Sequence, residues 1–109
     1  MPKFILLYNG PATPPSEMEP DKVQEVMRAW QAWMENVGPA LVDVGAPMDN
    51  GVSVVDDGST REAAELNGYS IVEATDRDAA LALVVGHPFL SDKTGTFSVD
   101  VFELLPVPM

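Results

Sequence analysis

Residues 68–85 read GYSIVEATDRDAALALVV, and they contain a strand signal followed directly by a helix signal. Apolar side chains alternate over residues 68–74, which is the period of a β-strand. Thr75 and Asp78 have the spacing of a capping box, which predicts a helix from about Asp76 to Val85. The alternating residues are Tyr69 and Ile71 on one side, and Val72 and Ala74 on the other.

A further strand is predicted after this helix. Gly86 and the His87-Pro88 step end the helix, because the residue before a proline avoids the helical conformation. Phe97 to Leu105 alternates again, with Val99 and Val101 opposite Phe102 and Leu104. The C-terminal half of the chain is therefore a strand–helix–strand unit.

The N-terminal half repeats this order. Lys3 to Tyr8 is apolar on both alternating sides, which is typical of a strand covered on both faces. A loop over residues 9–20 leads to a helix from Asp21 to Val37, whose apolar stripe has spacings of three and four. Leu41 to Ala46 predicts the second strand, closed by Pro47. The stripe consists of Val23, Val26, Met27, Trp30, Met34 and Val37, widened by Trp33.

The segment between the two units is expected to hold a hairpin. Asp49-Asn50-Gly51 is a tight-turn signal, and Val52 to Val55 would be the returning arm, ended by Asp56-Asp57-Gly58. A short helical turn around Arg61 to Leu66 is a weaker expectation for the residues that follow.

Two strand–helix–strand units in this order predict an α+β fold, the ferredoxin-like βαβ-βαβ pattern, in one domain over residues 1–109. Two helices would cover one face of an antiparallel sheet. Because the strands are apolar on both sides, the other face needs a cover as well, and a second copy of the sheet would supply it. The sequence thus predicts a homodimer, a dimeric α+β barrel.

The charge balance excludes several partners. Six basic residues against seventeen acidic ones give a formal net charge of -11, which repels nucleic acids and anionic membrane surfaces. No apolar run reaches the roughly 20 residues of a membrane span, and the start of the chain does not read as a signal peptide. The chain has no cysteine, so disulfides and thiolate metal sites are excluded. We expect a cytoplasmic protein.

His87 is the candidate general acid or base, because it is the only side chain with an ordinary pKa near neutrality. The alternative, which we favour, places it at the end of the helix, where it would bind the last carbonyls or lie in solvent. Asp43 and Glu73 each fall inside an apolar strand and are candidate carboxylate partners for it. The competing interpretation is that strand alternation turns each of them to solvent.

Aromatic residues provide the candidate ligand-binding positions, which are Tyr8, Trp33 and Phe89. Trp30 is expected in the core, and Trp33, one step around the helix, is expected to be partly exposed. We expect no metal, because neither His87 with Asp92 nor Asp56 with Asp57 offers enough ligands. No glycine-rich phosphate loop occurs, so no nucleotide cofactor is expected.

Short segments in a fixed order over most of the chain carry a family resemblance. They are residues 3–8 (KFILLY), 30–34 (WQAWM), 41–47 (LVDVGAP), 57–58 (DG), 67–74 (NGYSIVEA), 79–83 (AALAL), 88–90 (PFL) and the strand end 102–104 (FEL). With these segments the chain resembles the YCII-related family, which includes the DGPF-domain proteins. The resemblance implies a ferredoxin-like unit that dimerises through its sheet.

The chain departs from this family at the residues that matter for catalysis. The active site suggested for YCII proteins pairs a histidine on the first helix with an aspartate just before a proline after the second helix. Here His87 stands before Pro88, and the predicted helix from Asp21 to Val37 contains no histidine. Ser59-Thr60 also stands where the DGPF motif has Pro and Phe.

Two functions follow from these residues. The first is a homodimer that binds a small organic molecule in a pocket between the sheet and the loops. The alternative is a lyase or isomerase that uses His87 as general acid or base with Glu73 or Asp43 as its partner. The missing helix histidine favours the first.

Overall fold

The computed structural model describes residues 1–11 and 19–107, and its main body is a four-stranded sheet with the strand order β2-β5-β1-β6. The strands are β1 (Lys3–Asn9), β2 (Leu41–Asp43), β5 (Leu66–Glu73) and β6 (Ser98–Leu104). Every neighbouring pair is antiparallel. The expected loop over residues 9–20 lies largely outside the described residues.

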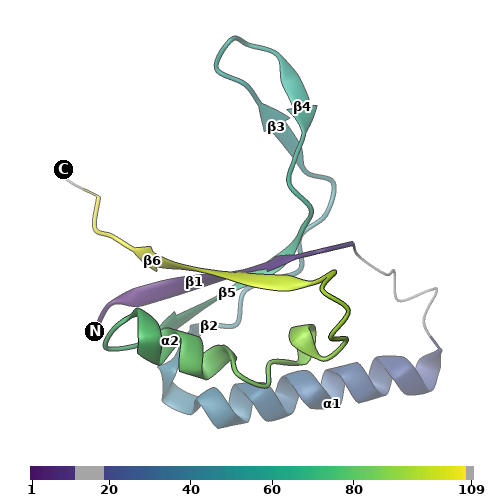
Figure 1. Cartoon of the computed structure of the whole chain (residues 1–109), viewed down its shortest axis with the longest axis vertical. Helices are drawn as coiled ribbons and strands as arrows, with labels where there is room; N and C mark the ends of the chain where they lie inside the picture. Colours follow the sequence, from purple (N-terminus) through teal and green to yellow (C-terminus); the bar gives the residue numbers. More distant parts are fainter. Residues whose placement is uncertain (12–18, 108–109) are drawn as a thin grey trace.

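Both helices cover the same face of this sheet (Figure 1). They are α1 (Pro20–Val37) and α2 (Arg77–Val84), each followed by a short 3-10 turn, η2 (Gly38–Ala40) and η3 (Pro88–Leu90). The predicted α+β fold, with two helices on one side of an antiparallel sheet, is therefore confirmed. Within the described residues, no helix combines the length and apolar character that crossing a membrane requires.

Local sequence explains where the helices begin and end. The side chain of Asp76 accepts a hydrogen bond from the backbone N–H of Ala79, so Asp76, and not Thr75, is the N-cap of α2. Pro20 occupies the first turn of α1, where its missing N–H is harmless. Gly38 ends α1 with a φ of 59°, a conformation that favours glycine.

Strand alternation divides the sheet into a helix-facing side and an open side. Phe4, Leu6 and Val72 on the helix side are fully buried, and the strand registers place Val99 and Val101 on this side too. The open side carries a second apolar set, of which Phe102 is 56% and Leu104 40% exposed. We call this set the open face; the register assigns it Ile5, Leu7, Tyr69, Ile71, Phe102 and Leu104.

The second strand is shorter than expected. β2 ends at Asp43, because the carboxylate of Asp43 accepts a hydrogen bond from the N–H of Gly45, and Gly45 has a φ of 79°. The chain bends here and returns to the sheet at Pro47, which bridges to Gly68 at the start of β5.

The hairpin was predicted with its turn at the wrong residues. Its strands are β3 (Val52–Val54) and β4 (Thr60–Glu62), and they are joined around Asp57 and Gly58 instead of Asp49-Asn50-Gly51. The carboxylate of Asp57 accepts hydrogen bonds from the backbone N–H and the hydroxyl of Ser59, and Gly58 has a φ of 90°. Residues 60–62 form a strand, so the helical turn expected around Arg61 to Leu66 is also wrong.

Candidate functional site

A chain of buried hydrogen bonds starts at His87, the residue just before η3. The Nδ1 atom of His87 accepts a hydrogen bond from the backbone N–H of Phe89 at 3.0 Å. The Nε2 atom lies 3.1 Å from the hydroxyl of Tyr8 on β1. That hydroxyl donates to Ser70 Oγ on β5 at 2.7 Å, and Ser70 donates to the carbonyl of Val44 at 2.7 Å.

The groups at the two ends of this hydrogen-bond chain fix which partner donates in every hydrogen bond between them. Because Nδ1 of His87 accepts a hydrogen bond, the ring proton is assigned to Nε2, which donates to Tyr8. Tyr8 then donates to Ser70, and Ser70 to a carbonyl that can only accept. Both ring nitrogens of His87 are thus occupied by protein groups.

Burial also sets the protonation states of His87 and Tyr8 in this hydrogen-bond chain. His87 is 1% exposed, and the rings of Tyr8, Trp30 and Trp33 lie within 4.3 to 5.0 Å of its ring. Burial lowers the pKa of His87 to about 4, so the imidazole is neutral at pH 7. Burial raises the pKa of Tyr8 to about 12, against the opposing effect of its hydrogen bond to Ser70. Our expectation of a solvated or carbonyl-binding His87 side chain was wrong.

The burial of the two tryptophans of α1 is the reverse of what we expected: Trp33 is in the core and Trp30 is partly exposed. Trp33 is only 5% exposed, and its Nε1 donates to the carbonyl of Leu83 at 2.9 Å. Trp30 is half-buried and packs edge-on against Tyr8, with ring centroids 5.3 Å apart. Trp33 packs against the last turn of α2, where Leu83 accepts its hydrogen bond, and Trp30 lines the cleft with Pro88 and Phe89 of η3.

The two candidate carboxylates do not meet His87. Asp43 is exposed and uses its carboxylate to hold the turn at Gly45. Glu73 is half-buried and stands opposite Lys3 in the strand register. It alternates with Val72, so it belongs to the open side of the sheet, whereas His87 lies on the helix side.

An open cleft of about 870 Å³ lies beside this buried chain, between α1, the segment after β2, the start of β5 and the segment around η3. Phe89 lies 5.2 Å from the Tyr8 ring and 5.4 Å from Phe97. The only ionisable acids among the described lining residues are Asp49 and Asp92, and no lysine or arginine is among them. Its aromatic residues are Tyr8, Trp30, Tyr69, Phe89 and Phe97.

Two of the three predicted ligand-binding residues therefore line this cleft. Tyr8 and Phe89 do so, and Trp33 does not. Sequence reasoning missed the parts played by Trp30 and Phe97, and it also missed the segment 44–49. Trp30 carried a usable signal, since it lies three residues before Trp33 on the same apolar stripe.

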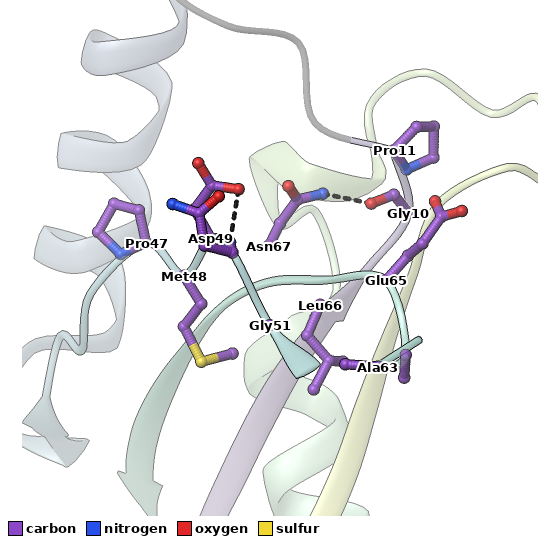
Figure 2. A pocket seen from close by; sticks show the side chains of 12 residues that line it. Gly10, Pro11, Pro47, Met48, Asp49, Gly51, Ala63, Glu65, Leu66 and Asn67 are labelled. Carbon is purple, nitrogen blue, oxygen red and sulfur yellow. Dashed lines mark hydrogen bonds between the residues drawn. The ribbon is translucent and has the colours of Figure 1, made fainter. Parts of the chain in front are cut away.

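A second cavity of about 700 Å³ adjoins the cleft and shares Pro11, Pro47, Met48, Asp49 and Asn67 with it. Figure 2 shows the side chain of Asn67 directed at the carbonyl of Gly10, to which it donates at 2.7 Å. This bond ties β5 to the end of β1. Within residues 1–11 and 19–107, no group of three His, Asp or Glu side chains is placed to hold a metal ion.

Comparison with solved structures gives similar folds. One is 5-chloro-2-hydroxyhydroquinone dehydrochlorinase (TftG) from Burkholderia phenoliruptrix AC1100, in complex with 2,5-dihydroxybenzoquinone. It has 21% identity and a TM-score of 0.55, over 94% of this chain and 93% of that one. Another is At3g17210 from Arabidopsis thaliana, with 14% identity and a TM-score of 0.48, over 100% and 98%.

Sequence comparison identifies the family. No curated protein matches the chain. The YCII-related domain, in contrast, matches residues 1–105, which is nearly the whole sequence. The order of strands and helices described above agrees with the fold that this resemblance implied. The chain belongs to the YCII-related family.

Proposed function

We propose that the protein is a homodimer that binds a small aromatic molecule, neutral or cationic, in the cleft of each protomer. The observation that carries this proposal is the lining of the cleft. The half-buried Trp30, Phe89 and Phe97 line it, and the buried Tyr8 lies behind them. Apolar walls with a few polar groups are typical of small-molecule sites.

The charges of the cleft select the class of ligand. The carboxylates of Asp49 and Asp92 lie among the described lining residues, without a lysine or arginine to offset them. A carboxylate or phosphate ligand would therefore be repelled. A hydroxylated or cationic ring would be favoured, because it can donate hydrogen bonds to the acids and stack on the aromatic residues.

The geometry supports binding over proton transfer by His87. A general base needs a free lone pair directed at its substrate. In His87, Nδ1 accepts from Phe89 and Nε2 donates to Tyr8, and the ring is 1% exposed. The similar fold of TftG holds a quinone, which makes a ring of that size a sensible probe for this chain. A cytoplasmic location stays a prediction from composition.

The dimer is supported by the open face. Phe102 and Leu104 are 56% and 40% exposed in a single chain, and Ile5, Leu7 and Ile71 lie on the same side of the sheet. Covering each large apolar side chain stabilises a complex by roughly 1.5–3 kcal/mol at full burial. A second copy packed face to face through a two-fold axis would cover all of them at once.

The two tryptophans provide the test for the ligand. Trp30 lines the cleft, whereas Trp33 is buried and hydrogen-bonded to Leu83. We expect titration with hydroquinone to shift the indole N–H signal of Trp30 in an NMR spectrum and to leave that of Trp33 in place. The variants Trp30→Phe and Trp33→Phe assign the two signals.

Benzoate is the matched control ligand, with one ring and a negative charge. We expect no shift with benzoate, because of the carboxylates in the cleft. Equal shifts with both compounds would contradict the charge selection, and no shift of Trp30 with any neutral or cationic ring would overturn the binding proposal. Sedimentation at micromolar concentration tests the dimer independently.

A further inference from the structure

The hydrogen-bond chain through His87 joins the two walls of the cleft. One wall is η3, which contributes Pro88 and Phe89, and the other is the segment 44–49 after β2. The chain starts at the backbone N–H of Phe89 and ends at the backbone carbonyl of Val44. It therefore holds both walls by main-chain atoms, through the buried side chains that lie between them. We call this hydrogen-bond chain the brace.

The segment 44–49 has few other attachments to the body of the protein. The N–H of Met48 donates to the carbonyl of Asn67 at 2.9 Å, and the carbonyl of Ala46 accepts from the N–H of Tyr69 at 3.3 Å. Both bonds attach the segment to the start of β5, and neither reaches η3. Among the hydrogen bonds of the described part of the chain, only those of the brace link this segment with η3.

Ser70 is the member of the brace that contacts the segment 44–49. It is fully buried in β5, and a buried hydroxyl costs free energy unless it is hydrogen-bonded. Its hydroxyl accepts from Tyr8 and donates to the carbonyl of Val44, each at 2.7 Å. Because the N–H of Phe89 can only donate and this carbonyl can only accept, the brace has a single arrangement. It is therefore suited to hold the walls in place.

We propose that Ser70 is a positioning residue for the cleft, and that through the brace it keeps the segment 44–49 and η3 at a fixed separation. This inference rests on the proposed binding of an aromatic ligand. It adds a residue that is not among those lining the cleft. A site with walls already in place binds more tightly, because the ligand does not have to order them.

The first test removes the hydroxyl of Ser70. We expect Ser70→Ala to weaken binding of hydroquinone about 10-fold, which corresponds to the cost of ordering one more flexible group. The matched control is Asp76→Ala, which also deletes one hydrogen-bonding side chain, the N-cap of α2, but lies outside the cleft. We expect this control to keep the wild-type affinity. The indole N–H signal of Trp30 reports binding, and thermal unfolding checks that both variants fold.

Tyr8→Phe cuts the brace at a second place, since it removes the hydroxyl between His87 and Ser70. If one brace holds the walls, the second cut has little left to remove. We therefore expect the double variant, Tyr8→Phe with Ser70→Ala, to bind hydroquinone no more than about 3-fold more weakly than the weaker of the two single variants. Effects that multiply in the double variant would show two independent contributions, and would refute the brace.

Amide hydrogen exchange measures the walls without a ligand. The amides of Met48 and Phe89 report on the two walls, since both donate hydrogen bonds. We expect Ser70→Ala to speed exchange at both amides relative to Asp76→Ala, because the walls open locally once the brace is cut. Exchange as slow as in the control at both amides would show that the walls do not depend on Ser70.

The outcomes separate the positioning role from the proposed function. A wild-type protein whose Trp30 signal responds to no neutral or cationic ring would overturn ligand binding and the positioning role with it. A wild-type protein that binds hydroquinone, with Ser70→Ala binding it equally well, would overturn the positioning role alone. If Ser70→Ala does not fold, Tyr8→Phe replaces it in the affinity and exchange measurements, with the same expected results.

Discussion

His87 illustrates how one buried side chain sets the response of the protein to acid. Its neutral ring lies among Tyr8, Trp30 and Trp33, and burial holds its pKa near 4, below the ordinary value of 6.5. In the unfolded chain the same ring takes up a proton at the ordinary value. Between these two pH values, the unfolded state binds more protons than the folded state.

Acid is therefore expected to weaken the fold through this residue. Stability is fully present above about pH 6.5, falls by about 1.4 kcal/mol per pH unit below it, and has lost about 3 kcal/mol by pH 4. Urea unfolding at several pH values measures the change. His87→Gln is the control, because an amide does not titrate. The carboxylates affect the pH dependence of both proteins equally, so subtracting the free energies of unfolding of the two proteins isolates the effect of His87. The same pH dependence in both would contradict a buried neutral histidine.

Among the elements, β2 owes its short length to the glycine that follows it. Gly45 has a φ of 79°, and a Cβ atom there would overlap the carbonyl oxygen of Tyr69 on the neighbouring β5. The same residue lines the cleft. The chain must therefore approach β5 closely at Gly45, and both the edge of the sheet at β2 and the wall of the cleft depend on this approach.

Gly45→Ala is expected to destabilise the protein well beyond the ordinary effect of alanine at a positive φ. Gly38, with a φ of 59° and no atom near its missing Cβ, is the matched control. We expect about 1–2 kcal/mol of lost stability for Gly38→Ala, and at least about 1 kcal/mol more for Gly45→Ala because of the overlap. Thermal or urea unfolding compares them. Equal losses would mean that the segment after β2 moves away from β5 without penalty.

The length and periodicity of an element decide whether the sequence predicts it. β1, β5, β6 and α1 are long and strongly periodic, so alternation and spacing locate them within one or two residues. The hairpin failed because two segments, 49–51 and 56–58, both carry turn chemistry, and only the hydrogen bonds of Asp57 distinguish them. Short strands such as β2 offer too few residues for a period to appear.

The candidate site was predicted only in part, for reasons of geometry. Tyr8 and Phe89 line the cleft, but the choice between Trp30 and Trp33 depends on where α2 ends against α1, which no local pattern contains. Glu73 and His87 could have been separated from sequence, since Glu73 alternates with the core residue Val72. The burial of His87 depends on Tyr8, 79 positions away in the chain.

At the scale of the whole molecule, charge opposes the proposed dimer. Two copies with a net charge of -11 each repel one another, and salt screens this repulsion over a Debye length of about 10 Å at 0.1 M. We therefore expect the dimer to become tighter as sodium chloride is raised from low to physiological concentration and above. Sedimentation at fixed pH over a salt series measures this. A dimer that loosens with salt would show that attraction between opposite charges across the interface outweighs the net repulsion.

The central position of β1 also has a consequence for synthesis. β1 pairs with β5 and β6, which are the last two strands of the chain to be made. Ribosomes add residues at about 5 to 20 per second, so roughly 3 to 13 seconds separate the completion of β1 from that of β5, the first of its partners to be made. Throughout this interval the apolar first strand has no partner. The sheet therefore cannot begin to form around β1 until β5 is made, and β1 is the segment that a chaperone at the ribosome would have to shield.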